Sequence, residues 1–381
     1  MFTILTKNKI SATGLAALTP DTYAVTDTHD NPDAIIVRSA SLHDDTFGSS
    51  LVAIARAGAG VNNIPINIAS GVGIAVFNTP GANANAVKEL VICALFLAAR
   101  KVVAGAQWAL GLKGEGSNVG KLVEKGKGAF GGGEIAGKTL GVIGLGAIGA
   151  LTANAAAALG MRVTGYDPYL SVQGALKLDP SAVVTDDLNT LLATSDYISL
   201  HLPLTDATRG FINAQSLTAC KEAVRILNFA RAELVDDADL IDALGAGKVA
   251  AYVTDFPTDA QLGTPGVTAL PHLGASTEES EENCAVMASR ELKDYLEQGI
   301  VTNSVNLPDT KLPAKTSPRI CVVHEGISGL VAQIGTAVGA NVTNLFSAEK
   351  KGVGYTVLDV AEPVDAAAIS GIPGVRRVRV I

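Results

Sequence analysis

The sequence predicts an α/β protein with parallel sheets that carry helices on both faces. Short apolar runs alternate with helical segments along most of the chain, which is the order typical of parallel sheets. Hydrophobic residues make up 48% of the 381 residues and there are 40 glycines, which indicates a compact protein and excludes a disordered one. At this length two or three domains are expected.

The most informative element is the stretch 139–168, in which strand, glycine turn, helix and second strand follow one another. Its three glycines have GxGxxG spacing, and each has a physical role in such a unit. Gly144 permits a tight turn, Gly146 lets the backbone approach a pyrophosphate, and Gly149 lets the helix pack against the strand. The N-terminus of the helix supplies free N–H groups for phosphates. The stretch therefore predicts a Rossmann-type dinucleotide-binding domain.

The second strand of this unit ends on Asp167, eighteen positions after the last glycine. A carboxylate at this place accepts hydrogen bonds from the adenosine ribose. The residues that follow, Pro168 to Leu170, include no cation that would neutralise a 2′-phosphate. We therefore expect NAD rather than NADP.

The N-terminal 85 residues or so predict a second, smaller α/β unit with four short strands. Two of its strands run directly into arginines, Arg38 and Arg56, and Arg56 is followed by Gly58 and Gly60. Ligands of open α/β sheets bind at the carboxyl ends of strands, so these arginines suit an anionic substrate. Solvated surface arginines are the other interpretation.

The remaining segments divide the chain further. A long apolar helix, 87 to about 103, connects two lobes, and the Gly- and Lys-rich residues 111–133 predict a loop or a short amphipathic excursion. Residues 305–317 are rich in proline and polar groups, which indicates a linker between domains. Beyond it, residues 318–381 show a βαββαβ pattern that indicates a separate small domain.

Composition narrows the class of protein. The net charge of −8 leaves no basic face, so nucleic acid is not an expected partner. The four cysteines are far apart without a CxxC pair, so free thiols in a reducing cytosol are expected, and no metal site is predicted. No apolar run is long enough to span a bilayer and the N-terminus lacks the layout of a signal peptide, so we expect a cytoplasmic protein without membrane contact.

Two side chains are placed for chemistry on a secondary alcohol. Arg231 follows a buried strand, where a guanidinium can hold a carboxylate by two parallel bonds; a surface ion pair is the alternative. His272 lies between a proline and a glycine turn, just after a strand, where core packing explains it poorly. An imidazole can accept the hydroxyl proton while a hydride leaves carbon. His201 also ends a strand, and contact with the cofactor or the core is its expected role.

Seven motifs in order, between about residues 35 and 280, resemble the D-isomer-specific 2-hydroxyacid dehydrogenases. They are VRSA from Val37, RAGAGV from Arg56, NTPG from Asn78, GLGAIG from Gly144, HLPLT from His201, NFAR from Asn228 and PHLGAST from Pro271. The resemblance implies a discontinuous, flavodoxin-like substrate lobe of residues 1–88 plus 275–304 and a continuous NAD-binding domain of residues 89–274. The RAGAGV and PHLGAST motifs point to members that act on phosphoglycerate.

The resemblance also implies functional residues at matching positions. Arg231 would anchor the carboxylate and His272 would act as acid and base. Substrate contacts are expected from Arg38, Ser39, Arg56, Ala57 and Gly58. Cofactor contacts are expected from Gly144, Gly146, Ala147, Ile148, Gly149, Asp167, Pro168, His201, Leu202, Pro203, Thr208, Phe229, Ala230, Asp255 and Gly274.

One departure concerns the carboxylate that pairs with the histidine. The family carries a glutamate three residues after the phenylalanine of a DVF segment, whereas this chain has Asp259 at that position and Ala260 in place of the usual proline. We expect Asp259 to reach His272 if its loop moves in or through one water. Asp255 is expected to face the nicotinamide amide, with its register also shifted.

The last 64 residues or so resemble an ACT domain, a small module that senses amino acids. His324 and Asn341 fall where serine-binding members carry effector contacts, but Gly326 replaces a usual asparagine. Feedback by serine and dimerisation through sheet edges therefore both remain open. A homodimer or homotetramer is expected.

The resemblance thus implies NAD-dependent oxidation of 3-phospho-D-glycerate to 3-phosphohydroxypyruvate, the first step of serine biosynthesis. A related interpretation is that the protein interconverts another D-2-hydroxyacid and its 2-keto acid, for example glycerate and hydroxypyruvate. A different class of function is an NAD-sensing scaffold, which is less favoured because the chain has an ACT-like domain and no disordered interaction tail.

Overall fold

The computed structural model describes residues 1–339, 341–362 and 364–381, and the chain forms two compact units. Unit 1 comprises Met1–Asn83 and Thr277–Ile381, and unit 2 comprises Ala84–Ser276. These boundaries lie a few residues from those expected at 88 and 274. The C-terminal segment, which the sequence predicts as a separate domain, groups with unit 1. Among the described residues, no helix combines the length and apolar character needed to cross a membrane.

Unit 2 is built on a parallel sheet of seven strands in the order β12-β11-β10-β9-β6-β7-β8. The chain order reverses between β6 and β9, as in a Rossmann-type doubly wound sheet, which confirms the predicted fold class. The strands are β6 (Thr139–Ile143), β7 (Arg162–Tyr166), β8 (Val183–Thr185), β9 (Tyr197–Leu200), β10 (Val224–Asn228), β11 (Val249–Thr254) and β12 (Val267–Ala269).

Helices cover this sheet and bury its apolar side chains. The connecting helices are α3 (Ala84–Ala99), α6 (Ala147–Ala158), α7 (Val172–Ala175), α8 (Leu188–Thr194), α9 (Ala214–Ala219) and α10 (Asp237–Gly245). Val91 and Leu95 of α3 are fully buried in one core cluster with Leu140 and Val142 of β6. The helix predicted from 87 to about 103 is wrong in its C-terminal bound, because it ends at Ala99 and a new helix follows.

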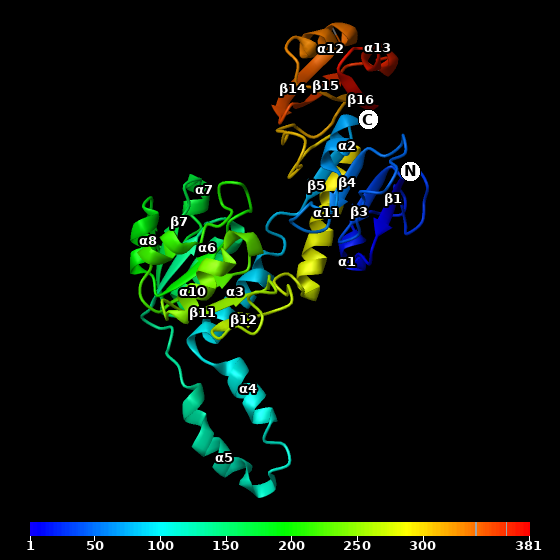
Figure 1. Ribbon diagram of the computed structural model, residues 1–381. Coiled ribbons are helices and arrows are strands. Elements are labelled where there is room, and N and C mark those ends of the chain that lie inside the picture. Colours follow the sequence, from blue (N-terminus) through cyan, green and yellow to red (C-terminus); the bar gives the residue numbers. More distant parts are fainter. Residues whose placement is uncertain (340, 363) are drawn as a thin grey trace. The chain divides into compact units, whose positions relative to one another are not determined.

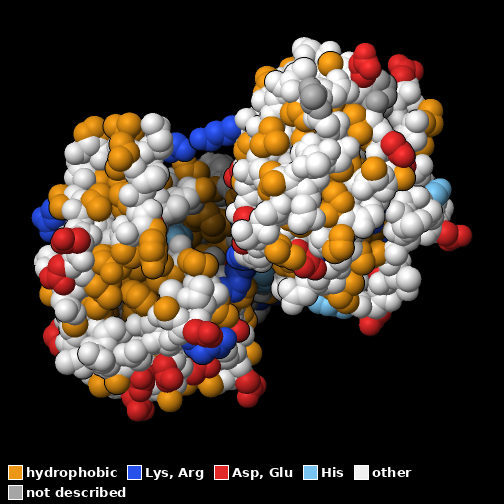
Figure 2. Space-filling model, turned by 90° about the horizontal axis from the view of Figure 1, so that it is seen from above, with side chains coloured by type: hydrophobic (Ala, Val, Ile, Leu, Met, Phe, Trp, Pro, Cys, Tyr) orange, Lys and Arg blue, Asp and Glu red, His pale blue; other side chains and the backbone are white. Residues whose placement is uncertain are grey.

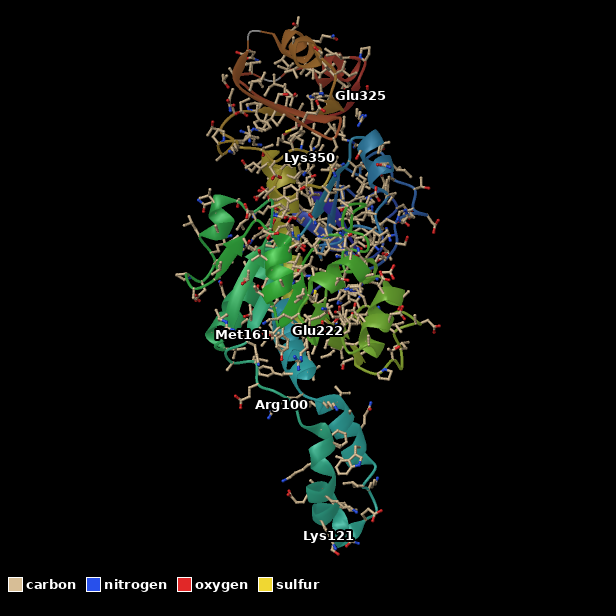
Figure 3. The ribbon with its side chains drawn as sticks, turned by 60° about the vertical axis from the view of Figure 1, so that its left-hand side comes forward. Arg100, Lys121, Met161, Glu222, Glu325 and Lys350 are labelled. Atoms are coloured by element: carbon tan, nitrogen blue, oxygen red, sulfur yellow. The ribbon has the colours of Figure 1, made fainter. Side chains whose placement is uncertain are left out.

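The residues after α3 form an arm of two helices, α4 (Val102–Leu110) and α5 (Val119–Gly126). The arm also contains the short 3-10 turns η1 (Gly116–Asn118) and η2 (Lys127–Phe130), and none of these four elements buries a residue. Figure 1 shows the arm leaving the rest of unit 2, and Figure 3 shows Arg100 at its base and Lys121 near its tip. The region predicted as a loop or amphipathic excursion is therefore mostly helical.

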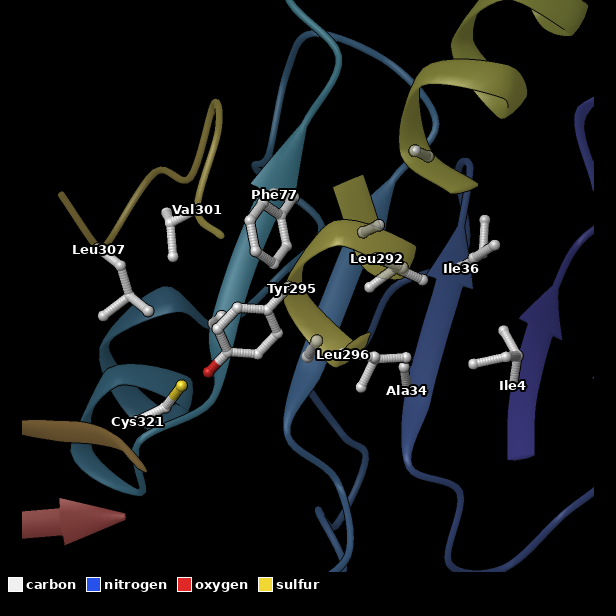
Figure 4. Close-up of a cluster of buried hydrophobic side chains, with 14 of the residues drawn as sticks. Ile4, Ala34, Ile36, Phe77, Leu292, Tyr295, Leu296, Val301, Leu307 and Cys321 are labelled. Carbon is white, nitrogen blue, oxygen red and sulfur yellow. The ribbon is translucent and has the colours of Figure 1, made fainter. Parts of the chain in front are cut away.

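Unit 1 contains a parallel sheet of five strands in the flavodoxin-like order β2-β1-β3-β4-β5, again as predicted. The strands are β1 (Phe2–Lys7), β2 (Tyr23–Thr26), β3 (Ala34–Val37), β4 (Ala53–Arg56) and β5 (Ala75–Asn78), with the helices α1 (Ala12–Leu15) and α2 (Ile66–Gly71). The long helix α11 (Glu278–Gln298) packs on this sheet. Figure 4 shows the shared core, in which Tyr295 and Leu292 of α11 lie beside Phe77.

The C-terminal segment forms an antiparallel sheet of four strands in the order β14-β15-β13-β16. Its elements are β13 (Arg319–Glu325), α12 (Leu330–Val338), β14 (Val342–Lys350), β15 (Val353–Val360), α13 (Ala366–Ser370) and β16 (Val375–Val380). The predicted βαββαβ order is thus confirmed, and the arrangement fits an ACT-like domain. On the face shown in Figure 2, basic side chains occur in small groups among uncharged ones.

Candidate active site

The glycine turn between β6 and α6 has the geometry that a dinucleotide requires. Gly144 adopts a φ of +90°, and a Cβ at this position would lie 2.5 Å from the His201 carbonyl oxygen. A Cβ on Gly149 would overlap the carbonyl oxygen of Gly144, so only glycine allows helix and turn to pack this closely. Gly146 has no atom within 4 Å of its Cβ position. The turn therefore offers open backbone at Gly146, next to Ala147 and Ile148 at the start of α6, and fits NAD.

Asp167 braces this turn from the end of β7. Its Oδ2 accepts a hydrogen bond of 2.9 Å from the Leu145 N–H, and its Oδ1 accepts one of 2.9 Å from the Tyr169 N–H. Each carboxylate oxygen keeps a further lone pair that a ribose hydroxyl can use. Pro168 follows Asp167 and is exposed.

The loop after β9 carries four of the predicted cofactor contacts. The His201 Nε2 lies 2.9 Å from the Ser199 hydroxyl, and desolvation lowers the pKa of His201 to about 4. The ring is therefore neutral at physiological pH and is a weak proton acceptor. The Thr208 hydroxyl donates a hydrogen bond of 2.6 Å to the Pro203 carbonyl, in the loop that also contains Leu202.

A buried asparagine organises the loop that carries Arg231. The Oδ1 of Asn228 accepts from the Ala230 N–H at 3.2 Å, and its Nδ2 donates to the Arg231 carbonyl at 2.8 Å and to the Tyr252 hydroxyl at 3.1 Å. These bonds fix the backbone from Phe229 to Arg231. Asn228 opens the NFAR motif, but no role is predicted for it from sequence.

Phe256 brings the two predicted catalytic side chains of unit 2 together. The Arg231 guanidinium lies 5.8 Å from the centre of the Phe256 ring, and the His272 ring centre lies 4.4 Å from it. Both side chains are exposed, so they are accessible to a ligand. His272 adopts a φ of +49°, which L-residues rarely do, and its N–H donates to the Asp255 carbonyl at 2.9 Å. Sequence reasoning missed Phe256, and its place after Asp255 was the available signal.

Asp255 is the buried carboxylate next to this pair. It is 1% exposed, its Oδ2 accepts from the Gly274 N–H at 2.8 Å, and its Oδ1 has no partner among the described residues. Burial raises its pKa, whereas the Gly274 N–H and the charges of His272 and Arg231 oppose that rise. The carboxylate therefore interacts electrostatically with both catalytic candidates.

Asp259, by contrast, is exposed, and within the described part of the chain it has no hydrogen bond or ion pair with His272. The structure thus does not bring the two together, since the loop after Phe256 turns Asp259 to solvent. Its pairing with His272 stays a prediction.

The predicted substrate contacts of unit 1 gather at the ends of β3 and β4. The Arg38 Nη2 forms an ion pair of 2.6 Å with Glu281 Oε1 of α11, and the Arg56 Nε donates to the Arg38 carbonyl at 3.0 Å. The N–H of Ser39 donates to Asn8 Oδ1 at 2.9 Å, which leaves its hydroxyl for a ligand. Glu281 and Asn8 were not predicted from sequence, because 243 and 31 residues separate them from Arg38 and Ser39.

The backbone after Arg56 also fits a ligand site. Ala57 is buried, and its N–H donates to the Val37 carbonyl at 2.8 Å. Gly58 adopts a φ of +156°, and a Cβ there would overlap the Arg56 guanidinium.

The two candidate effector residues use their side chains within the C-terminal domain. His324 is buried, with Nδ1 2.7 Å from the Glu325 carbonyl and Nε2 2.8 Å from the Thr356 hydroxyl. Asn341 bonds both the carbonyl and the N–H of Glu362. An effector would have to replace these bonds. Nowhere in the described ranges do three or more His, Cys, Asp or Glu side chains group to hold a metal.

Comparisons with known proteins show which sequences and structures this chain is similar to. Residues 94–274 match the family model described as the NAD-binding domain of D-isomer specific 2-hydroxyacid dehydrogenases. D-3-phosphoglycerate dehydrogenase of Bacillus subtilis is 34% identical over 326 residues, which is 81% of this chain and 59% of that protein. The enzyme of the same name from Methanocaldococcus jannaschii is 37% identical over 286 residues, 73% of this chain and 52% of that protein.

Among solved structures, the NAD+-bound 3-phosphoglycerate dehydrogenase of Entamoeba histolytica is similar with a TM-score of 0.60 at 26% identity, covering 80% of this chain and 98% of that one. The chain spans between half and three fifths of the length of the two curated relatives, at 52% and 59%.

Proposed function

We propose that the chain belongs, through the NAD-binding domain that residues 94–274 match, to the D-isomer specific 2-hydroxyacid dehydrogenases, and that it oxidises 3-phospho-D-glycerate to 3-phosphohydroxypyruvate with NAD. The observation that carries this proposal is the grouping of Arg231 and His272 around Phe256 beside the buried Asp255. This grouping supplies a carboxylate anchor and a proton acceptor, which are the two groups that oxidation of a 2-hydroxyacid requires. The product, 3-phosphohydroxypyruvate, would then be an intermediate of serine biosynthesis.

Four residues of this chain have separate roles in the proposed reaction. Arg231 holds the substrate carboxylate and so fixes the position of C2. His272 accepts the proton of the C2 hydroxyl. The carboxylate of a neighbouring aspartate stabilises the imidazolium that results. Bound NAD supplies the acceptor for the hydride of C2. Arg38 and Arg56 neutralise the phosphate of the substrate.

The supporting carboxylate is Asp255 in the described arrangement, and Asp259 is the alternative if its loop closes. Asp255 is also the candidate for the nicotinamide amide, since its Oδ1 is buried without a partner among the described residues.

The test is a steady-state assay of the purified chain with NAD and a panel of 2-hydroxyacids. 3-Phospho-D-glycerate should give the highest kcat/KM, and NADP should be far poorer because Asp167 repels a 2′-phosphate. Arg231→Lys should lose most of the activity, since an ammonium cannot form two parallel bonds. Higher kcat/KM with glycerate would favour the alternative substrate. No turnover of any acid with intact NAD binding would favour a sensing scaffold.

We further propose that the arm of α4 and α5 makes the chain a homodimer. Helices this short are marginal in water alone, and none of the residues of α4 and α5 is buried. Leu110 at the end of α4 is 78% exposed. By light scattering, Leu110→Asp should convert dimer to monomer, whereas Val172→Asp at an equally exposed site (76%) should not. A second copy is the proposed occupant of this surface.

Two finer proposals concern location and regulation. The four cysteines are free, one of them exposed (Cys93), which supports a reducing compartment such as the cytoplasm. The C-terminal sheet is proposed to be an ACT domain that regulates the enzyme or joins subunits. Addition of L-serine to the assay tests regulation, and an effect that His324→Ala removes would support it.

A further inference from the structure

We propose that Glu281 is a specificity-determining residue, which weakens the binding of doubly charged phosphorylated acids at Arg38. This inference rests on the proposed function, because it assigns Arg38 and Arg56 to the phosphate end of the substrate. It goes further in stating that the affinity for phosphate is limited by a residue of this chain.

The ion pair is accessible to a ligand. The Arg38 Nη2 lies 2.6 Å from Glu281 Oε1, and the two side chains are 39% and 40% exposed. A pair this exposed contributes on the order of 0–1 kcal/mol to folding. Folding stability therefore gives little reason for a carboxylate at position 281, whereas its charge acts directly on the guanidinium that a substrate would use.

Arg56 belongs to the same group of charges. Its Nε donates to the Arg38 carbonyl at 3.0 Å, which places the two arginines at neighbouring strand ends. Cys284 lies one turn after Glu281 on α11 and is close to both guanidinium groups: burial raises the pKa of its thiol, and the charges of Arg56 and Arg38 oppose that rise. The arginines and the first turns of α11 thus meet in one small region of unit 1.

The charge balance of this region is the physical reason for the proposal. The Arg38 guanidinium would attract a phosphate of charge −2, but Glu281 already pairs with it and neutralises its charge. A phosphate must therefore share Arg38 with a carboxylate or displace it, and it is repelled by that carboxylate in either case. A substrate that ends in a neutral hydroxyl has no such cost.

The size of the effect follows from Coulomb's law. Removing one negative charge about 6 Å from a dianion, near a protein surface at physiological salt, should strengthen binding by roughly three- to twentyfold. Glu281→Gln makes this change with the length of the side chain preserved, and its amide oxygen can still accept a hydrogen bond from Arg38.

The experiment measures dissociation constants of the full chain by calorimetry in the presence of NADH, a condition in which hydroxyacids bind without turnover. Titrants are 3-phospho-D-glycerate and D-glycerate. In Glu281→Gln the phosphorylated acid should bind three- to twentyfold more tightly, and D-glycerate should change by less than about twofold. Glu281→Asp, which keeps the charge, should stay near the unmodified protein.

The matched control is Glu279→Gln, the same change at an exposed position of the same helical turn. Unchanged or weaker binding of the phosphorylated acid in Glu281→Gln would overturn the proposal, as would an equal gain in Glu279→Gln. Failure of the proposed function is seen separately, as absence of NAD reduction by the unmodified protein with 3-phospho-D-glycerate. That failure does not prevent the gain in binding from being measured.

Discussion

At the scale of single residues, His272 is the group on which the proposed chemistry depends most. We expect His272→Asn to lower kcat by on the order of a hundredfold or more, because the hydroxyl proton then has no acceptor. NAD binding, followed by fluorescence quenching on titration, should be unchanged. A near-normal kcat would mean that another group takes the proton. His201 is poorly suited to replace it, since burial lowers its pKa to about 4.

The identity of the supporting carboxylate gives a second prediction. Asp255 is 1% exposed and feels the charges of His272 and Arg231, whereas Asp259 is exposed. Asp255→Asn should therefore lower kcat more than Asp259→Asn. Burial raises the pKa of Asp255 above the usual value for aspartate, about 3.9. As the pH is lowered, activity that needs the ionised carboxylate should therefore begin to fall at a pH above that value. Asp255→Asn should remove this acidic limb of the pH–activity profile. A larger loss in Asp259→Asn would show that its loop closes over the substrate.

A third residue, Glu291 of α11, predicts how folding stability depends on pH. It is 5% exposed, its Oε1 accepts from Asn303 Nδ2 at 2.7 Å, and its Oε2 has no partner among the described residues. Burial raises its pKa to about 8. Between pH 4.5 and 8 the native state then binds more protons at this site than the unfolded state, so stability falls as pH rises.

Glu291→Gln should remove this loss, with little change at pH 5 and a gain of up to roughly 4 kcal/mol in the free energy of unfolding at pH 8.5. Urea denaturation at the two pH values measures it, with Glu279→Gln as the control. Parallel pH dependence in Glu291→Gln and the unmodified protein would contradict the assignment.

Local sequence identified the residues that carry chemistry but not their partners. Arg231 is predicted because it follows a buried strand, and His272 because it follows a strand between a proline and a glycine turn. The ion pair of Arg38 with Glu281 is not predicted, since it joins residues that are distant in the chain. Asp259 is expected to be the carboxylate because it stands where the resemblance places the family's glutamate, and a matching position does not define which side chain of that loop is buried.

At the scale of elements, the β6–α6 turn separates two roles of glycine. A Cβ on Gly149 would overlap the Gly144 carbonyl, whereas Gly146 has no atom within 4 Å of its Cβ position. Gly149→Ala should therefore destabilise the protein without ligand by roughly 1–3 kcal/mol, the usual effect of overpacking. Gly146→Ala should leave that stability unchanged and weaken NAD binding. Thermal unfolding with and without NAD distinguishes the two, and equal losses of stability would contradict this division.

Strands were the elements best predicted from sequence, because buried parallel strands are short β-branched runs that end at turns. The arm of α4 and α5 was predicted less well. Its Gly- and Lys-rich composition is typical of a loop, and its helices bury no residue within the chain, so no apolar periodicity marks them.

At the scale of the whole molecule, the order of elements predicted three sheets, but not that the C-terminal sheet shares a core with the N-terminal one. Cys321 and Tyr355 of that sheet belong to the same buried cluster as Tyr295 and Leu296 of α11. The predicted linker, 305–317, gave no sign of this association, because contacts between distant segments leave no local pattern. The C-terminal sheet thus contributes to the cluster of unit 1, and it also packs a separate cluster of its own with Leu330 and Ile334 of α12.

This shared core leads to the last prediction, that the C-terminal domain stabilises the end of α11. Arg379 Nη2 donates to the carbonyls of Tyr295 at 3.0 Å and Leu296 at 2.9 Å, and its guanidinium lies 4.3 Å from the Tyr295 ring centre. The Tyr295 carbonyl also accepts from the Gly299 N–H at 3.0 Å. Carbonyls in the last turn of a helix lack a partner within it, and Arg379 supplies one to the Leu296 carbonyl. Arg379→Lys should lower the free energy of unfolding by about 1–3 kcal/mol, because an ammonium cannot bond both carbonyls and stack on the ring. Arg290→Lys, at an exposed position of the same helix, should change it by less than about 0.5 kcal/mol. In calorimetry the C-terminal domain and the five-stranded sheet should unfold in one transition. Two separate transitions, of which Arg379→Lys shifts only the earlier one, would show that they fold independently.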